Sequence, residues 1–199
     1  GRRGRSWFAS PGDSLTFSLL WRFAPGTAPA GLSLAVGLAV AQAVAAVGAG
    51  DAALKWPNDI LKDGRKLGGI LIELLPGAPH AAVIGIGLNL RLAAAMPDEL
   101  RAASAALDLP DADPDALYAS LLTHLLERLE QFAGAGFAPM RDAWTARHAH
   151  QDAPVVLSAD FGTPRQGICR GVDSDGALLL ECDGRVERVL SGEVSLRPA

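Results

Sequence analysis

The sequence is poor in cysteine and lysine, and each shortage narrows the functions it can have. Cys169 and Cys182 are too few for a disulfide scaffold and lack the spacing of a zinc site, so we expect a reduced, cytoplasmic protein. The lysines are Lys55, Lys62 and Lys66 alone. A lysine inside a motif is therefore informative, although Lys62 and Lys66 are typical of the ordinary surface of a hairpin.

Several functional patterns are missing as well. The histidines form no Ser/His/Asp arrangement and no metal-binding spacing, so hydrolysis through an activated serine is unsupported. The first residues lack an apolar core, and we expect no secretory leader. The most apolar stretch, Gly31 to Gly48, is built of alanine and other small residues, which favours a buried helix over a membrane span. A net charge of -4 disfavours binding to nucleic acid, so any anion site must be local.

The composition is that of a globular protein, and the sequence pattern predicts a mixed α/β domain followed by a small β domain. The chain has 199 residues, of which 49% are hydrophobic and 20% charged. We expect a strand over residues 13–23 and helices over residues 31–48, 115–132 and 138–148. A hairpin is expected to turn at "KDGRK". After His148, short apolar segments alternate with turns such as "DSDG" and "CDG", which predicts a small β-barrel. The predicted domains are residues 1–150 and 151–199.

The opening "GRRGRSW" combines arginine, glycine and tryptophan. Guanidinium groups bind phosphate or carboxylate in a bidentate manner, glycine lets the backbone approach a ligand, and Trp7 could stack on a planar heterocycle. Taken alone, the pentapeptide "GRRGR" is more typical of a frayed basic terminus than of a folded anion site.

The segment "KWPND" places a lysine and an Asn-Asp pair around a proline-fixed turn. Pro57 fixes its own φ, so the turn is rigid and its neighbours are held in place. Lys55 could supply a point charge to a carboxylate or phosphate, and Asp59 could help to hold a metal ion. A simple strand-to-turn transition with a solvated lysine is the alternative.

Glycines interrupt two apolar strands. Gly68 and Gly69 lie in "KLGGILIEL", and Gly85 and Gly87 lie in "IGIGLNL". Glycine inside a strand often marks a ligand that lies flat against the backbone, although sheet packing can explain any one of these positions. Asn89 ends the second strand and offers a donor and an acceptor to a nucleobase edge.

Together these pieces resemble the biotin–protein ligases. "GRRGR-x-W", "KWPNDI", "RKLGGILIE", "GIGLN" and "GEVSLR" occur in that family's order, from Gly1 to Arg197, and the pair formed by "KWPND" and the arginine/glycine motif is specific. The resemblance implies an α+β fold: a mixed sheet flanked by helices, similar to class II aminoacyl-tRNA synthetases, with a C-terminal SH3-like β-barrel. It also implies that ATP activates biotin to biotinyl-5′-AMP, with Mg2+, before transfer to a lysine of a biotin carboxyl carrier domain, and a possible homodimer.

The same resemblance implies a role for individual residues. Arg2 and Lys55 are the implied catalytic residues, with Lys55 bridging the biotin carboxylate and the α-phosphate. Gly1, Arg2, Lys55, Gly69, Gly85 and Gly87 are the implied biotin-binding residues. Arg3, Arg5, Trp7, Asn58, Asn89 and Arg197 are the implied ATP-binding residues. Asp59 is the implied metal ligand.

One departure and three alternatives accompany this resemblance. The family motif begins two residues before Gly1, after a segment that bonds the ureido ring of biotin, so we expect a chain truncated at its N-terminus. A lipoate or octanoate protein ligase shares the implied fold and a similar lysine. A non-enzymatic binding module and an inactive truncated fragment are the other two alternatives.

Overall fold

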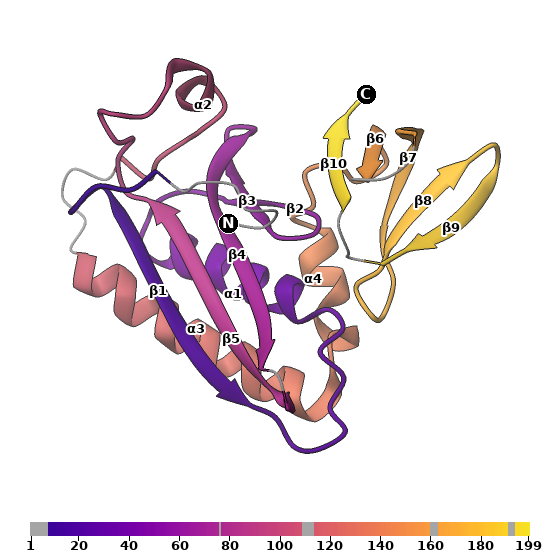
Figure 1. The fold of residues 1–199 in the computed structure, drawn as a ribbon, viewed down its shortest axis with the longest axis horizontal. Coiled ribbons are helices and arrows are strands. Elements are labelled where there is room, and N and C mark those ends of the chain that lie inside the picture. Colours follow the sequence, from indigo (N-terminus) through magenta and orange to yellow (C-terminus); the bar gives the residue numbers. More distant parts are fainter. Residues whose placement is uncertain (1–7, 76, 109–113, 160–162, 191–193) are drawn as a thin grey trace.

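Two antiparallel sheets and a layer of helices make up the protein (Figure 1). The computed structural model describes residues 8–75, 77–108, 114–159, 163–190 and 194–199. The first sheet has the strand order β1-β5-β4-β3-β2. Its strands are β1 (Ser14–Arg22), β2 (Ala53–Lys55), β3 (Asp59–Lys62), β4 (Arg65–Leu75) and β5 (Ala78–Asn89).

The first sheet is antiparallel at every strand pair, whereas a mixed sheet was expected. The reason is local connectivity: β2, β3, β4 and β5 follow one another through short turns, and a short turn can join antiparallel neighbours only. The β3–β4 turn is the one predicted at "KDGRK". Asp63 and Gly64 both have positive φ there, 50° and 71°, as a type I′ hairpin turn requires.

Helices cover one face of this sheet. α1 (Leu32–Ala46) is the alanine-rich stretch, and it is buried on nearly every side because it lies between the sheet and α3 (Pro114–Ala135). α3 buries Leu117, Leu121, Leu125 and Leu129 at four-residue spacing. The short elements are α2 (Asp98–Ala102), η2 (Ala138–Met140) and α4 (Arg141–Thr145). Within the described residues, no helix is both long and apolar enough to cross a membrane.

The second sheet has the order β10-β6-β7-β8-β9 and lies beside the first unit (Figure 1). Its strands are β6 (Pro154–Ala159), β7 (Arg165–Val172), β8 (Leu178–Cys182), β9 (Arg185–Val189) and β10 (Val194–Pro198). The α+β class is confirmed. In the described part of the chain β9 and β10 do not pair, so the sheet does not close into the expected barrel. The division at residues 150 and 151 stays a prediction.

The two units meet around the "KWPND" segment. Trp56 is fully buried, and its Nε1 donates to the carbonyl of Gly176, 3.1 Å away in the β7–β8 turn. Gly176 packs so closely on Gly31, at the start of α1, that a Cβ on Gly176 would lie 2.8 Å from the Gly31 Cα. On the other side, β2 is held at Leu54, whose N–H donates to the carbonyl of Arg147 at 2.8 Å.

Candidate functional site

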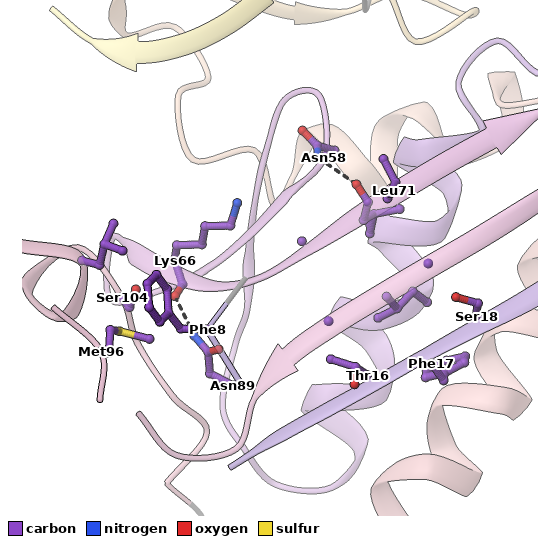
Figure 2. Close-up of a pocket in the computed structure, with 16 residues that line it drawn as sticks. Phe8, Thr16, Phe17, Ser18, Asn58, Lys66, Leu71, Asn89, Met96 and Ser104 are labelled. Carbon is purple, nitrogen blue, oxygen red and sulfur yellow. Dashed lines mark hydrogen bonds between the residues drawn. The ribbon is translucent and has the colours of Figure 1, made fainter. Parts of the chain in front are cut away.

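An open pocket of about 490 Å3 lies on the face of the first sheet that α1 and α3 do not cover. The side chain of Ile70 reaches α1, because its Cδ1 lies 3.6 Å from a Cβ built at Gly37. Side chains alternate along a strand, so Gly69 and Leu71, which flank Ile70 in β4, face away from the helices. Both line the pocket, and Figure 2 shows Leu71 there.

Glycine forms the floor of this pocket. Gly69 in β4 lies opposite Gly87 in β5, and Gly85 lies between Leu71 and Ser18 of the two neighbouring strands. A Cβ added at Gly85 would find nothing closer than 3.6 Å. Backbone packing therefore does not require glycine at position 85. What its missing side chain provides is open space above the sheet, where a flat ligand can lie against the backbone.

Gly68 has the opposite character. A Cβ there would lie 2.5 Å from the carbonyl oxygen of Gly87 and 2.6 Å from Cδ2 of Leu88, on the buried side of the sheet. Glycine is thus needed at position 68 for packing. The predicted slot glycines Gly69, Gly85 and Gly87 line the pocket, and Gly68 does not.

A carboxylate between two lysines lies at one end of the floor. Asp59 Oδ1 is 2.5 Å from Nζ of Lys66, and its Oδ2 is 3.4 Å from Nζ of Lys55. Burial by itself would raise the pKa of Asp59, yet the two ammonium groups, Lys66 foremost, hold that pKa below its ordinary value. Asp59 is therefore an ionised carboxylate with an ammonium group at each oxygen.

Lys66, and not Lys55, is the lysine that lines the pocket. A Cβ added at Gly69 would lie 3.5 Å from Cε and from Nζ of Lys66, so the ammonium group lies over the glycine floor. Lys55 is on the far side of Asp59. The sequence interpretation treated Lys66 as ordinary hairpin surface. Regular alternation would place Lys66 and Gly69, three residues apart, on opposite faces of β4, and the irregularity in the β3–β4 pairing after Ile60 brings them to the same face.

The two predicted asparagines also line the pocket, each already bonded to the protein. Asn58 donates from Nδ2 to the main-chain carbonyl of Ile70 at 2.8 Å, and the main-chain carbonyl of Asn58 accepts from the Ile70 N–H at 2.9 Å. Asn89 is 5% exposed and donates from Nδ2 to the carbonyl of Ala105 at 2.9 Å. The same Nδ2 also donates to the carbonyl of Lys66 at 3.5 Å, so the group of Asn89 left for a ligand is its side-chain carbonyl oxygen, Oδ1, which is an acceptor.

The segment after β5 forms a wall at the lysine end of the pocket. Met96, Leu100 and Ser104 contribute the lining side chains, and Figure 2 shows Met96 and Ser104 at the same end as Lys66. This wall is pinned to the sheet by backbone bonds on both sides of Lys66, whose N–H donates to Ala103 and whose carbonyl accepts from Ala105. Lys62 fixes it further, since its Nζ lies 2.8 Å from the Leu107 carbonyl.

The remaining predicted residues are not brought to this pocket among the residues that the structure describes. Arg197 is exposed on β10, opposite Val156 of β6, and does not line the pocket. Gly1, Arg2, Arg3, Arg5 and Trp7 lie outside the described residues. Phe8, the next residue along the chain, does line the pocket and was not predicted to do so.

The residues present do not fit a magnesium ion at Asp59. Mg2+ requires an accessible carboxylate and near-octahedral oxygen ligands, and each Asp59 oxygen already faces an ammonium group. Across the described ranges, no three His, Cys, Asp or Glu side chains are grouped so that they could hold a metal ion.

Comparisons with known proteins place the chain in one family. Residues 1–89 match the Biotin/lipoate A/B protein ligase family, and residues 163–197 match the Biotin protein ligase C terminal domain. The chain is 39% identical to the Bifunctional ligase/repressor BirA of Escherichia coli (strain K12), over 100% of this chain and 63% of that protein. It is 37% identical to a Mycobacterium tuberculosis protein named Biotin–[acetyl-CoA-carboxylase] ligase, over 98% of this chain and 73% of that protein.

A solved structure is similar as well. Biotin protein ligase from Aquifex aeolicus, in complex with biotin and ATP, superposes with a TM-score of 0.87 at 26% identity, over 100% of this chain and 84% of that one. The chain thus spans somewhat less than two thirds of the Escherichia coli protein, 63% of its length, but more of the other two relatives.

Proposed function

This chain belongs to the biotin–[acetyl-CoA-carboxylase] ligase family, and from that premise we propose that it is an ATP-dependent biotin–protein ligase. Its pocket binds biotin and ATP, joins them as biotinyl-5′-AMP with release of pyrophosphate, and delivers biotin to a lysine of a biotin carboxyl carrier domain. The observation that carries this proposal is the ammonium group of Lys66, held over a floor of glycines.

The first step brings two anions together, and the pocket supplies what that step needs. The biotin carboxylate attacks the α-phosphate, so negative charge gathers at phosphorus while pyrophosphate leaves. A fixed ammonium group between the two reactants offsets their repulsion and stabilises the developing charge. Lys66 is the one cationic side chain among the described residues that line the pocket, and we assign this role to it in place of Lys55.

The floor and the asparagines account for binding. The bicyclic ring of biotin would lie flat over Gly85 and Gly87, where no side chain rises from the sheet. Asn89 would accept a hydrogen bond from the adenine amino group through Oδ1. The roles of Gly1, Arg2, Arg3, Arg5 and Trp7 stay predictions, as does that of Arg197. Any magnesium ion that accompanies ATP is not assigned to Asp59.

Transfer of labelled biotin to a carrier domain tests the proposal. The chain is incubated with ATP, radiolabelled biotin and a biotin carboxyl carrier domain, and label on the carrier is counted. We expect transfer that requires ATP, and a rate lowered roughly 100- to 1,000-fold by Lys66→Ala, the usual effect of removing one group that stabilises developing charge.

Two controls make that result specific. Arg141→Ala removes a half-exposed cation from α4, outside the pocket lining, and should leave the rate unchanged. Lipoate with a lipoyl domain replaces biotin and its carrier in a parallel reaction. Faster transfer of lipoate than of biotin would overturn the proposal in favour of the lipoate ligases that share the first matched family.

A further inference from the structure

We propose that the hydroxyl of Ser18 binds the ureido edge of biotin and thereby favours biotin over acids that lack a ureido group. The inference rests on the proposed function and deepens it, because it names a residue with which the pocket distinguishes one acid from another. Its starting point is β1, which forms one side of the glycine floor although none of its residues was among the predicted site residues.

The hydroxyl of Ser18 lies at the edge of the floor and faces it. Ser18 pairs with Gly85 across β1 and β5, and its Oγ lies 3.8 Å from a Cβ built at Gly85. The residue is exposed, and its hydroxyl has no hydrogen-bond partner within the described ranges. Unlike Nδ2 of Asn58 and of Asn89, this group is therefore available to a ligand, both as a donor and as an acceptor.

The other side of Gly85 is apolar. Leu71 pairs with Gly85 from β4, and its Cβ lies 3.6 Å from the same built Cβ. A ring over Gly85 thus has a hydrocarbon side chain along one edge and a hydroxyl along the other. The fused rings of biotin have the same asymmetry, since the thioether ring is apolar and the ureido ring carries two N–H donors and a carbonyl. With the ureido edge at Ser18, no polar group of the ligand is buried against Leu71.

The position of Lys66 sets the direction in which the ligand runs. Its ammonium group lies over Gly69, where the proposed reaction needs the biotin carboxylate. Gly69 is two strands and two residues away from Ser18, which is about 12 Å for strands about 4.8 Å apart that rise about 3.3 Å per residue. That span suits a fused bicycle on a valeryl chain. Figure 2 shows Lys66 and Ser18 at opposite ends of the pocket, so the ureido ring, the far end of the ligand, comes to Ser18.

Lipoate cannot use Ser18 in this way. It has a ring, a similar chain and a carboxylate, but its dithiolane ring carries neither an N–H group nor a carbonyl. Lipoate over Gly85 would displace water from the Ser18 hydroxyl and give no hydrogen bond in return. A site that hydrogen-bonds one ligand disfavours the analogue that lacks the bonding group, so Ser18 adds to the preference for biotin.

Isothermal titration of wild type and Ser18→Ala with three acids tests this inference. The acids are biotin, desthiobiotin, which keeps the ureido ring but lacks the sulfur, and lipoate. Ser18→Ala should weaken the binding of biotin and of desthiobiotin by the same factor, about 2- to 13-fold, the usual effect of one hydrogen bond between uncharged groups. The affinity for lipoate should not change.

Thr16→Val is the matched control. Thr16 is exposed on the same strand, lines the pocket and pairs with Gly87, two residues nearer to the row that contains Gly69. Valine keeps the shape of threonine and removes its hydroxyl, so the ratio of biotin to lipoate affinity should stay at the wild-type value. A lowered ratio in Thr16→Val with an unchanged ratio in Ser18→Ala would place the ureido edge over Gly87 and overturn the inference.

A second variant at the same position separates the hydroxyl from the fold. Ser18→Thr keeps a hydroxyl and suits a strand, and it should keep the wild-type ratio of affinities; a ratio as low as that of Ser18→Ala would contradict the inference. Equal weakening of all three acids by Ser18→Ala, or no weakening of any, would overturn it while leaving the proposed function in place. Failure of wild type to bind biotin at all would overturn the proposed function, and this inference with it.

Discussion

Gly85→Val should weaken ligand binding without harming the fold. A Cβ at position 85 meets its nearest neighbours, Cβ and O of Leu71, at 3.6 Å, and Oγ of Ser18 at 3.8 Å, which is ordinary contact. The two methyl groups beyond that Cβ rise into the pocket. Valine also suits a strand better than glycine does, by up to about 1 kcal/mol.

The expected size of the effect follows from overpacking. Forcing extra carbon atoms into a filled site costs about 1–3 kcal/mol, which weakens binding by roughly 5- to 150-fold. Gly68→Ala is the matched contrast, because its Cβ would meet a backbone oxygen at 2.5 Å. There the same cost falls on folding, and at about 2–4 °C per kcal/mol in a chain of this size it lowers the melting temperature.

Isothermal titration with biotin, together with thermal unfolding followed by circular dichroism, separates the two effects. Gly85→Val should lose affinity and keep its melting temperature, whereas Gly68→Ala should lose melting temperature. If Gly85→Val binds biotin as tightly as wild type, then the ligand does not lie on the glycine floor and the reasoning is refuted.

Three further outcomes are expected. Burial, with a neighbouring histidine, lowers the pKa of His148 from 6.5 to about 4. Its neutral form therefore stabilises the fold above pH 6.5, and about 3 kcal/mol should be lost as the pH falls towards 4; urea unfolding free energies that stay level over that range would contradict this. Trp56→Phe leaves the carbonyl in the β7–β8 turn without its donor and should cost about 1–3 kcal/mol in urea unfolding. The Nε1 of Trp21 has no hydrogen-bond partner among the described residues, so Trp21→Phe should cost less. Equal losses in the two variants would show that the Trp56 hydrogen bond does not stabilise the fold. Leu125→Ala should lower the free energy of unfolding in urea by about 2–5 kcal/mol, and Leu126→Ala, at its exposed neighbour, by less than about 0.5 kcal/mol. A larger loss in Leu126→Ala than in Leu125→Ala would contradict the described orientation of α3.

Local patterns predicted most of the helices and strands. The alanine-rich stretch became α1, and the long amphipathic segment became α3 with its leucines at four-residue spacing. The "KDGRK" turn lies where expected because Asp63 and Gly64 have the positive φ that its residues favour. These features depend on neighbours in the sequence, so the sequence alone contains them.

Neighbouring residues in the sequence could not show whether Lys55 or Lys66 lines the pocket. It depends on the register that places Gly69 opposite Asp59, and on an irregularity in β3–β4 pairing after Ile60. That irregularity shifts the partners along β4, so simple alternation read from the hairpin turn does not place Lys66. The resemblance to a family supplied the motif, and the strand pairing decided which lysine enters the pocket.

Contacts between residues far apart in the sequence could not be predicted from the sequence either. Trp56 and Gly176 are 120 positions apart, and the sequence around either residue does not predict its contact with the other. Asn89 was predicted to offer donor and acceptor alike, but the wall at Ala105 takes up its amide nitrogen. Asn58 and Asn89 both line the pocket, and which of their hydrogen-bonding groups stay available became known only from the fold.

Biotin-dependent exchange of labelled pyrophosphate into ATP tests the central claim most directly, because it reports formation of biotinyl-5′-AMP in the pocket without any carrier. The account predicts exchange in wild type that requires biotin, and much slower exchange in Lys66→Ala and in Gly85→Val. Exchange that proceeds at the wild-type rate in both variants would contradict the claim that the chemistry takes place over this floor.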